Sequence, residues 1–244
     1  MPSLKRHIPN ALTCCNLLSG CVATVFALQG SFAAAMAAVV TGAVFDFFDG
    51  FAARLLHVAS PIGKELDSLA DDVTFGVAPA AMAFALLSET ELPFAGATAR
   101  LVVPYLAFLI AAFSALRLAK FNLDTRQTHT FIGLPTPANA LFWSALTVGC
   151  GDTLAASPYG FYVIMVLAAL SCYLLVAEIP MFALKFTSYG WAANRIRYSF
   201  LLASIVLLVI LGWTGFSAVI VLYVVLSILT GRRAQGNHPK TDKA

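Results

Sequence analysis

The chain has 244 residues, of which 60% are hydrophobic and 11% are charged, and its mean hydropathy is +0.85. Soluble domains are about 25% charged, so 27 charged side chains (15 basic and 12 acidic) cannot cover a water-soluble fold of this length. This excludes a cytosolic globular enzyme and a disordered chain, and a net charge of +3 is too small to indicate nucleic acid as a partner. The composition predicts a polytopic membrane protein.

Eight apolar segments are long enough for membrane-spanning helices, since about 20 apolar residues cross the hydrocarbon core. The predicted spans are residues 8–29, 31–56, 65–88, 98–121, 136–154, 158–178, 196–211 and 213–231. Residues 198–230 are free of charge and would form one helix of about 50 Å, which exceeds a core of about 30 Å. A break between Gly212 and Gly215 is therefore expected, and it makes the last two spans a hairpin.

The basic residues predict the orientation of these spans, because cytoplasmic loops are enriched in Lys and Arg. With eight spans, every Lys and Arg except Arg100 falls on the face that carries both termini. The expected architecture is an all-α polytopic membrane protein with about eight transmembrane helices and both termini in the cytoplasm. Residues 1–231 would form one transmembrane domain, and residues 232–244 a short polar cytoplasmic tail. The segment 18–21 resembles a lipoprotein cleavage box, but cleavage would remove a span, so a retained first helix is expected.

Four aspartates are predicted to lie together near the cytoplasmic ends of the second and third spans. Asp46 and Asp49 are three residues apart, and Asp67 and Asp71 are four apart, so each pair shares one helical face. Acids within spans are costly and usually functional. Close carboxylates repel one another in a low dielectric, and a hard divalent cation bound by oxygen ligands offsets this repulsion. The sequence therefore predicts a site for Mg²⁺ or Mn²⁺, with one ion or two.

Gly50 and Arg54 follow the first aspartate pair and extend this site toward a phosphate group. Gly50 leaves space for a ligand to approach the backbone, and the guanidinium of Arg54 can bind a phosphate with two parallel hydrogen bonds. A set of interhelical ion pairs is less favourable, because the four acids would need more cations than this segment carries. A cation-coupled transporter is also less favourable, because it would spread its acids along a path through the membrane.

The spacing of these residues resembles the signature of the CDP-alcohol phosphatidyltransferase family. The matching pattern is Asp46-x2-Asp49-Gly50-x2-Ala53-Arg54-x8-Gly63-x3-Asp67-x3-Asp71. The resemblance implies a dimeric membrane enzyme that transfers a phosphatidyl group from a CDP-linked lipid to an alcohol and releases CMP. It also implies that residues 1–231 are a single catalytic domain.

The same resemblance implies roles for individual residues. Two metal ions would share the four aspartates as ligands, and Asp71 would also act as the general base. Residues of the first three helices would contact the CDP part of the lipid: Asn10, Thr13, Gly50, Arg54 and Ser60. Asp72 lies about 100° around the helix from Asp71 and is not expected to bind metal.

Three further stretches resemble the bacterial-type phosphatidylserine synthases within this family: residues 66–80, 117–122 and 133–140. They imply CDP-diacylglycerol as the donor and L-serine as the alcohol. Serine carries a carboxylate that needs a cation, and Arg117, Lys120 and Arg126 are available at and beyond the end of the fourth span. Two alternatives are that these three residues only mark the cytoplasmic face, or that the acceptor is another alcohol, such as inositol or glycerol 3-phosphate.

The expected partners are CDP-diacylglycerol, L-serine, membrane lipids and a second copy of the chain in a homodimer, with no nucleic acid. The expected location is the inner membrane of the cell, crossed several times, with the active site facing the cytoplasm.

Overall fold

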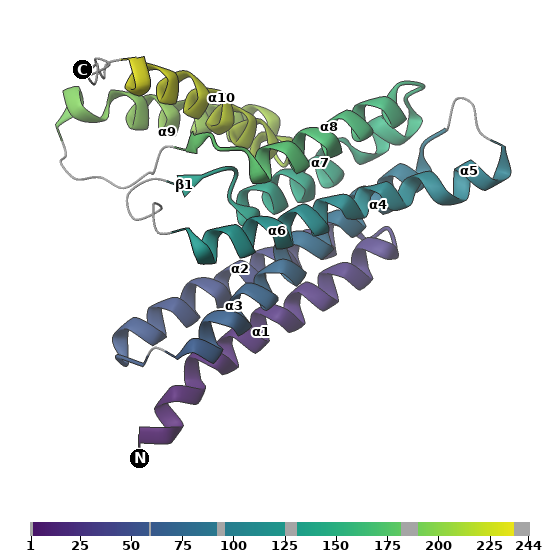
Figure 1. Cartoon of the computed structure of the whole chain (residues 1–244). Coiled ribbons are helices and arrows are strands. Elements are labelled where there is room, and N and C mark those ends of the chain that lie inside the picture. The colour runs from purple at the N-terminus through teal and green to yellow at the C-terminus, as the bar shows by residue number, and fades with distance from the viewer. Residues whose placement is uncertain (1, 59, 92–95, 125–130, 182–189, 237–244) are drawn as a thin grey trace, which may run out of the picture.

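The computed structural model describes residues 2–58, 60–91, 96–124, 131–181 and 190–236, and nearly all of them are helical (Figure 1). Within these ranges eight helical segments follow one another, and the third and fourth are composite. The elements are α1 (Pro2–Leu28), α2 (Phe32–Leu55), α3 (Pro61–Asp71) continued by η1 (Asp72–Val77) and α4 (Ala78–Glu89), α5 (Ala97–Val102) continued by η2 (Val103–Phe108) and α6 (Leu109–Leu123), α7 (Thr136–Ala156), α8 (Gly160–Val176), α9 (Trp191–Leu211) and α10 (Thr214–Gly236). Two antiparallel two-residue strands, β1 (Phe131–Ile132) and β2 (Pro180–Met181), join the connections before α7 and after α8.

Each of the eight segments overlaps one predicted span. In the part of the chain that the structure describes, five helices are long and apolar enough to cross a membrane: His7–Leu28, Phe32–Leu55, Pro61–Glu89, Thr98–Leu123 and Asn194–Leu211. Two further apolar helices are shorter, Gly160–Val176 and Thr214–Thr230. The all-α, membrane-spanning class is confirmed, while the number of spans and the side of the membrane that holds the termini stay predictions.

The predicted break in the long apolar run after residue 198 is confirmed. Helix α9 ends at Leu211 and α10 begins at Thr214. Between them Gly212 has a φ of +55°, a left-handed conformation that glycine adopts without the steric cost that a Cβ imposes. The chain can therefore reverse direction here within two residues.

The third segment begins earlier than the apolar pattern predicts, at Pro61 instead of residue 65. Ser60 caps the helix, because its Oγ accepts a hydrogen bond from the backbone N–H of Gly63 at 3.0 Å, and Pro61 fits the first helical position. The helix widens into a π-helix, η1, directly after Asp71. Such π-turns are rare and are frequent at functional sites.

The core lies around α4, which is buried along most of its length between the other helices. Leu86 and Leu87 of α4 pack into one cluster with Trp143 of α7 and Ile164 of α8. Next to the start of α4, α1 approaches η1 so closely that a Cβ on Gly20 would lie 2.7 Å from the Cα of Thr74. This close contact fixes the first helix against the segment that follows Asp71.

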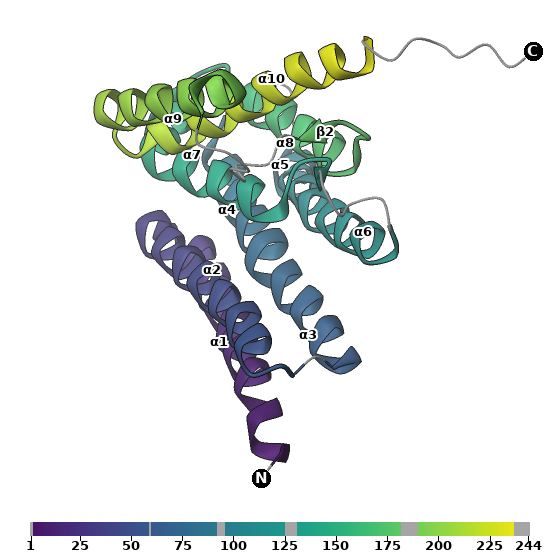
Figure 2. The same ribbon diagram turned by 90° about the vertical axis from the view of Figure 1, so that its left-hand side faces the viewer.

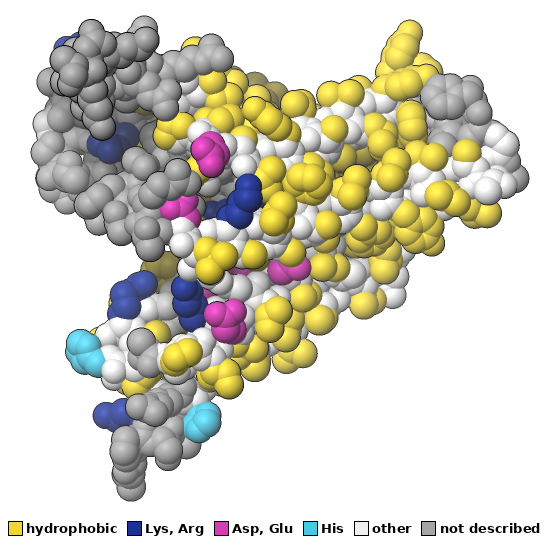
Figure 3. Space-filling model, viewed as in Figure 1, with side chains coloured by type: hydrophobic (Ala, Val, Ile, Leu, Met, Phe, Trp, Pro, Cys, Tyr) yellow, Lys and Arg dark blue, Asp and Glu magenta, His cyan; other side chains and the backbone are white. Residues whose placement is uncertain are grey.

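The two views of the ribbon separate the helices into two groups, with α1, α2 and α3 below and α7 to α10 above (Figures 1 and 2). The start of α1, the α2–α3 connection, β1 and the end of α10 lie on the left in Figure 1. Among the described residues in the space-filling view, the charged side chains gather toward this left side, and apolar side chains predominate over the helices to the right of them (Figure 3). An apolar outer surface is what a bilayer-embedded helix bundle requires, because lipid tails surround it.

Candidate active site

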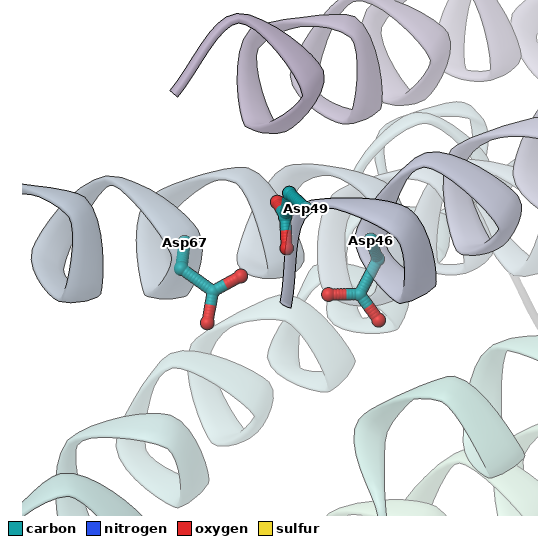
Figure 4. A group of neighbouring side chains, drawn as sticks. All are labelled: Asp46, Asp49 and Asp67. Carbon is teal, nitrogen blue, oxygen red and sulfur yellow. The ribbon is translucent and has the colours of Figure 1, made fainter. Parts of the chain in front are cut away.

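Three carboxyl groups meet where α2 ends and α3 begins. Asp46 and Asp49 come from α2 and Asp67 from α3, and one ligand oxygen from each lies within 4.8 Å of the others. Figure 4 shows the three groups converging on one region between the helices. The structure thus brings together residues that are 21 positions apart in sequence (46 to 67), as the helical spacing predicts.

These carboxylates suit a hard divalent cation. Asp49 is buried and Asp46 and Asp67 are half-buried. Asp67 Oδ1 is a buried atom with no hydrogen-bond partner among the described residues, and such an atom is costly unless a partner or an ion satisfies it. Oxygen-only ligands at this spacing fit Mg²⁺ or Mn²⁺. Which ion is bound, and whether two bind, stay predictions.

Asp71 lies one turn beyond Asp67 and is not part of this three-carboxylate group. Its Oδ1 accepts a hydrogen bond from Asn16 Nδ2 of α1 at 3.2 Å. Asn16 is fully buried, and its backbone oxygen accepts a hydrogen bond from Thr74 Oγ1 at 2.9 Å. Asp71 is therefore oriented from α1, and its assignment as a fourth metal ligand and as the general base stays a prediction.

Helix α1 also holds Asp49. Thr13 Oγ1 lies 2.6 Å from Asp49 Oδ2 and donates a hydrogen bond to it, and Thr13 is buried. Thr13 was expected beside the CDP lipid, and no role was expected for Asn16. A usable signal existed: Thr13, Asn16 and Gly20 follow one another at spacings of three and four, which places them on one face of an otherwise apolar helix.

A cleft of about 240 Å³ opens beside the carboxylates, between α1, α2 and the start of α3. It brings together four of the five residues expected at the CDP lipid, and two of the aspartates: Asn10, Thr13, Asp49, Gly50, Ser60 and Asp67. The fifth, Arg54, is exposed, and its Nη1 lies 3.6 Å from the position that a Cβ on Gly50 would occupy. Ser60 lines the cleft while its Oγ caps α3.

A second cleft, of about 290 Å³, lies at the end of α6 and contains two of the three cations expected at serine, Arg117 and Lys120. Arg117 is buried, with Nη1 3.5 Å from Thr136 Oγ1 and its guanidinium carbon 5.1 Å from the centre of the Phe121 ring. Glu178, after α8, lines the same cleft. The third expected cation, Arg126, lies outside the described residues.

The model of the CDP-alcohol phosphatidyltransferase family matches residues 6–176 of this chain. The chain belongs to the CDP-alcohol phosphatidyltransferase family. The match extends from α1 through α8 and includes all four aspartates, Gly50 and Arg54. The family uses divalent metals, in agreement with the three-carboxylate group.

Several curated relatives share one name, CDP-diacylglycerol–serine O-phosphatidyltransferase. The protein of Bacillus subtilis (strain 168) is 41% identical over 132 residues, which cover 54% of this chain and 70% of that protein. The protein of Mycobacterium leprae (strain TN) is 39% identical over 142 residues, 55% of this chain and 44% of the relative. The protein of Helicobacter pylori (strain ATCC 700392 / 26695) is 34% identical over 135 residues, 54% of each. The matched regions thus span about half of the last two relatives.

Proposed function

We propose that this protein makes phosphatidylserine by transferring the phosphatidyl group of CDP-diacylglycerol to the hydroxyl of L-serine, with release of CMP. The observation that carries the proposal is the convergence of Asp46, Asp49 and Asp67 beside a cleft between α1, α2 and α3. The family supports the transfer reaction, and the name shared by the relatives supports serine as the acceptor.

The cleft beside the carboxylates is the proposed site of the CDP group. Asn10 and Thr13 offer polar contacts from α1, and Gly50 leaves its floor free of a side chain. Arg54 stands one turn beyond Gly50, where its exposed guanidinium can bind a pyrophosphate oxygen with two parallel hydrogen bonds. Ser60 completes the far wall at the start of α3.

Asp46, Asp49 and Asp67 are the proposed ligands of Mg²⁺ or Mn²⁺, with Asp71 contributing to a second ion. Bound divalent cations stabilise negative charge on phosphoryl oxygens and on a departing phosphate. The protein's own part is to hold the carboxylates in place before substrate arrives, through Thr13 on Asp49 and Asn16 on Asp71.

Asp71 is the proposed general base. Its carboxylate accepts the proton of the serine hydroxyl while the serine oxygen forms a bond to the lipid-side phosphorus. The bond between that phosphorus and the bridging oxygen breaks, and CMP leaves with the electron pair. Asn16 positions the base, because its Nδ2 donates a hydrogen bond to Asp71 Oδ1.

The cleft at the end of α6 is the proposed serine site. Arg117 and Lys120 provide positive charge for the serine carboxylate, and Glu178 provides negative charge for its ammonium group. Arg126 is proposed as a further contact. Burial strengthens the electrostatic contribution of Arg117 more than that of the exposed Lys120.

We propose that the enzyme works as a homodimer in the inner membrane, with its active site facing the cytoplasm. The concentration of basic residues on the predicted cytoplasmic face supports this orientation. The carboxylate group also lies at the α2–α3 end of the bundle, on the side where charged side chains gather.

The proposal is tested by offering purified protein CDP-diacylglycerol with Mg²⁺ or Mn²⁺ and one alcohol at a time: L-serine, inositol or glycerol 3-phosphate. The measurement is CMP release, with a no-alcohol reaction as the control. We expect release with serine that stops when the metal is chelated. Release only with another alcohol would overturn serine as the acceptor while leaving the transfer reaction in place.

A further inference from the structure

A cavity lies away from the carboxylates, between α7, α8 and α10. Its volume is about 650 Å³, within the range of about 300–1,000 Å³ that is typical of ligand pockets. Its walls are mostly aliphatic, and none of its lining residues lines the cleft beside the carboxylates. Representative wall residues are Leu134, Phe142, Leu174, Ile220 and Val224.

One polar side chain of this cavity lacks any partner among the described residues. Asn139, in the first turn of α7, is fully buried and lines the cavity. Its Oδ1 and Nδ2 both lack a hydrogen-bond partner within the described ranges. Burying an amide without partners is unfavourable, so an occupant that hydrogen-bonds to Asn139 would offset this cost.

The opening of the cavity faces lipid. Leu170 of α8 and Val221 and Val225 of α10 line the cavity and are also exposed on the outer surface. Around an apolar helix bundle this surface meets acyl chains instead of water. Water inside would be poorly held, because an ordered buried water makes about three hydrogen bonds and these walls are aliphatic.

We propose that the cavity binds an acyl chain of a membrane glycerophospholipid, whose ester group hydrogen-bonds to Asn139. The aliphatic walls match the acyl chain, and the amide of Asn139 matches the ester group. Glu178 lines both this cavity and the cleft of Arg117 and Lys120. The polar end of the bound lipid therefore lies next to the proposed serine site and separate from the proposed CDP site.

Trp143 provides a natural reporter for this lipid. It is fully buried, and its Nε1 donates a hydrogen bond to Oγ of Ser171, a residue that lines the cavity, at 3.0 Å. The chain has two other tryptophans, so a protein carrying Trp191→Phe and Trp213→Phe reports on Trp143 alone. It is reconstituted in phosphatidylcholine vesicles with either brominated or ordinary acyl chains, because bromine quenches nearby tryptophan fluorescence.

We expect the fluorescence of Trp143 to be lower in the brominated vesicles. Adding Val225→Phe, which narrows the opening of the cavity, should restore the fluorescence of Trp143. Adding Val209→Phe on α9, which is exposed and does not line the cavity, should leave the quenching unchanged. Equal quenching with both additions, or no quenching at all, would overturn the proposal.

The role of Asn139 is tested by the number of phospholipids that the purified protein retains, measured by native mass spectrometry. Asn139→Leu should lose the bound lipid, because the ester has no partner in its place. The variant is expected to fold, since the Asn139 side chain makes no hydrogen bond with the described residues. Undiminished retention by Asn139→Leu would contradict the proposed contact. Neither measurement uses catalytic activity, so both can fail while the proposed enzymatic function stands.

Discussion

Two fully buried asparagines show how differently the two halves of the bundle are built. The side-chain Nδ2 of Asn16 on α1 donates a hydrogen bond to Asp71, the backbone oxygen of Asn16 accepts one from Thr74, and α1 is in close contact with η1 at Gly20. Asn139 on α7 has no side-chain partner among the described residues and borders a wide apolar cavity. The α1–α3 region is pre-organised for chemistry, whereas the α7–α10 region has space for a flexible apolar ligand.

The largest expected effect comes from removing a carboxylate of the pre-organised region. Asp67→Asn should reduce CMP release to background, because a neutral amide is a weak ligand for a hard cation. Asp152→Asn, at an exposed site on α7, is the matched control and should be fully active. The activity of both variants is measured as the initial rate of CMP release at saturating Mg²⁺ or Mn²⁺. Normal activity of Asp67→Asn would show that the three-carboxylate group is not the catalytic centre.

Asn16→Ala should lower kcat by about 10- to 100-fold, as is typical when a residue that orients a catalytic ligand is lost. The KM for CDP-diacylglycerol should change little, because Asn16 contacts Asp71 and not the cleft. Ser19→Ala is the control, since the Ser19 hydroxyl donates its hydrogen bond to the backbone oxygen of Cys15 in its own helix. A rise in KM with unchanged kcat would contradict a role in positioning the base.

Thr13→Val should raise the metal concentration needed for half-maximal activity by about tenfold, because Asp49 loses the donor that orients it. Thr13→Ser keeps a hydroxyl at the same place and should restore most of the metal affinity. Activity is titrated with Mn²⁺ in both variants. Equal Mn²⁺ titration curves for Thr13→Val and Thr13→Ser would show that the Thr13 hydroxyl does not act through the metal site.

The smallest effect is expected in the other half. Asn139→Leu should keep its activity and, in delipidated detergent, unfold at the same temperature as the unaltered protein or a higher one, because an unpartnered buried amide is replaced by an apolar group. Asn16→Leu should unfold at a lower temperature under the same conditions, since Asp71 loses the hydrogen bond that Asn16 donates to it. The unfolding temperatures of both variants are measured in detergent. An equal decrease in both would contradict the proposed difference between the two halves of the bundle.

Much of this architecture follows from local sequence. Apolar runs locate the helices, Gly212 marks the reversal between α9 and α10, and helical periodicity brings Asp46, Asp49 and Asp67 to one place. These features depend on neighbours within a few turns or on one short connection. The cap at Ser60 is also local, and the Ser60-Pro61 pair could have indicated that α3 begins there.

Other features depend on how distant segments pack and could not be predicted. The bond from Asn16 to Asp71 joins residues 55 positions apart, and it requires the close approach of α1 to η1. The π-helix after Asp71 and the cavity beside Asn139 likewise have no signature in hydropathy. Buried polar residues within apolar helices are the useful signal, because each one needs a partner that the sequence alone does not identify.

The most direct test of the central claim is the incorporation of labelled L-serine into lipid by purified protein and by its Asp71→Asn variant. Supplied with CDP-diacylglycerol and divalent metal, the unaltered protein should form labelled phosphatidylserine. A folded Asp71→Asn protein, verified by circular dichroism and gel filtration, should be slower by about 10²- to 10⁴-fold, the usual contribution of a general base. Undiminished synthesis by the folded variant, or no labelled lipid from the unaltered protein, would contradict the account.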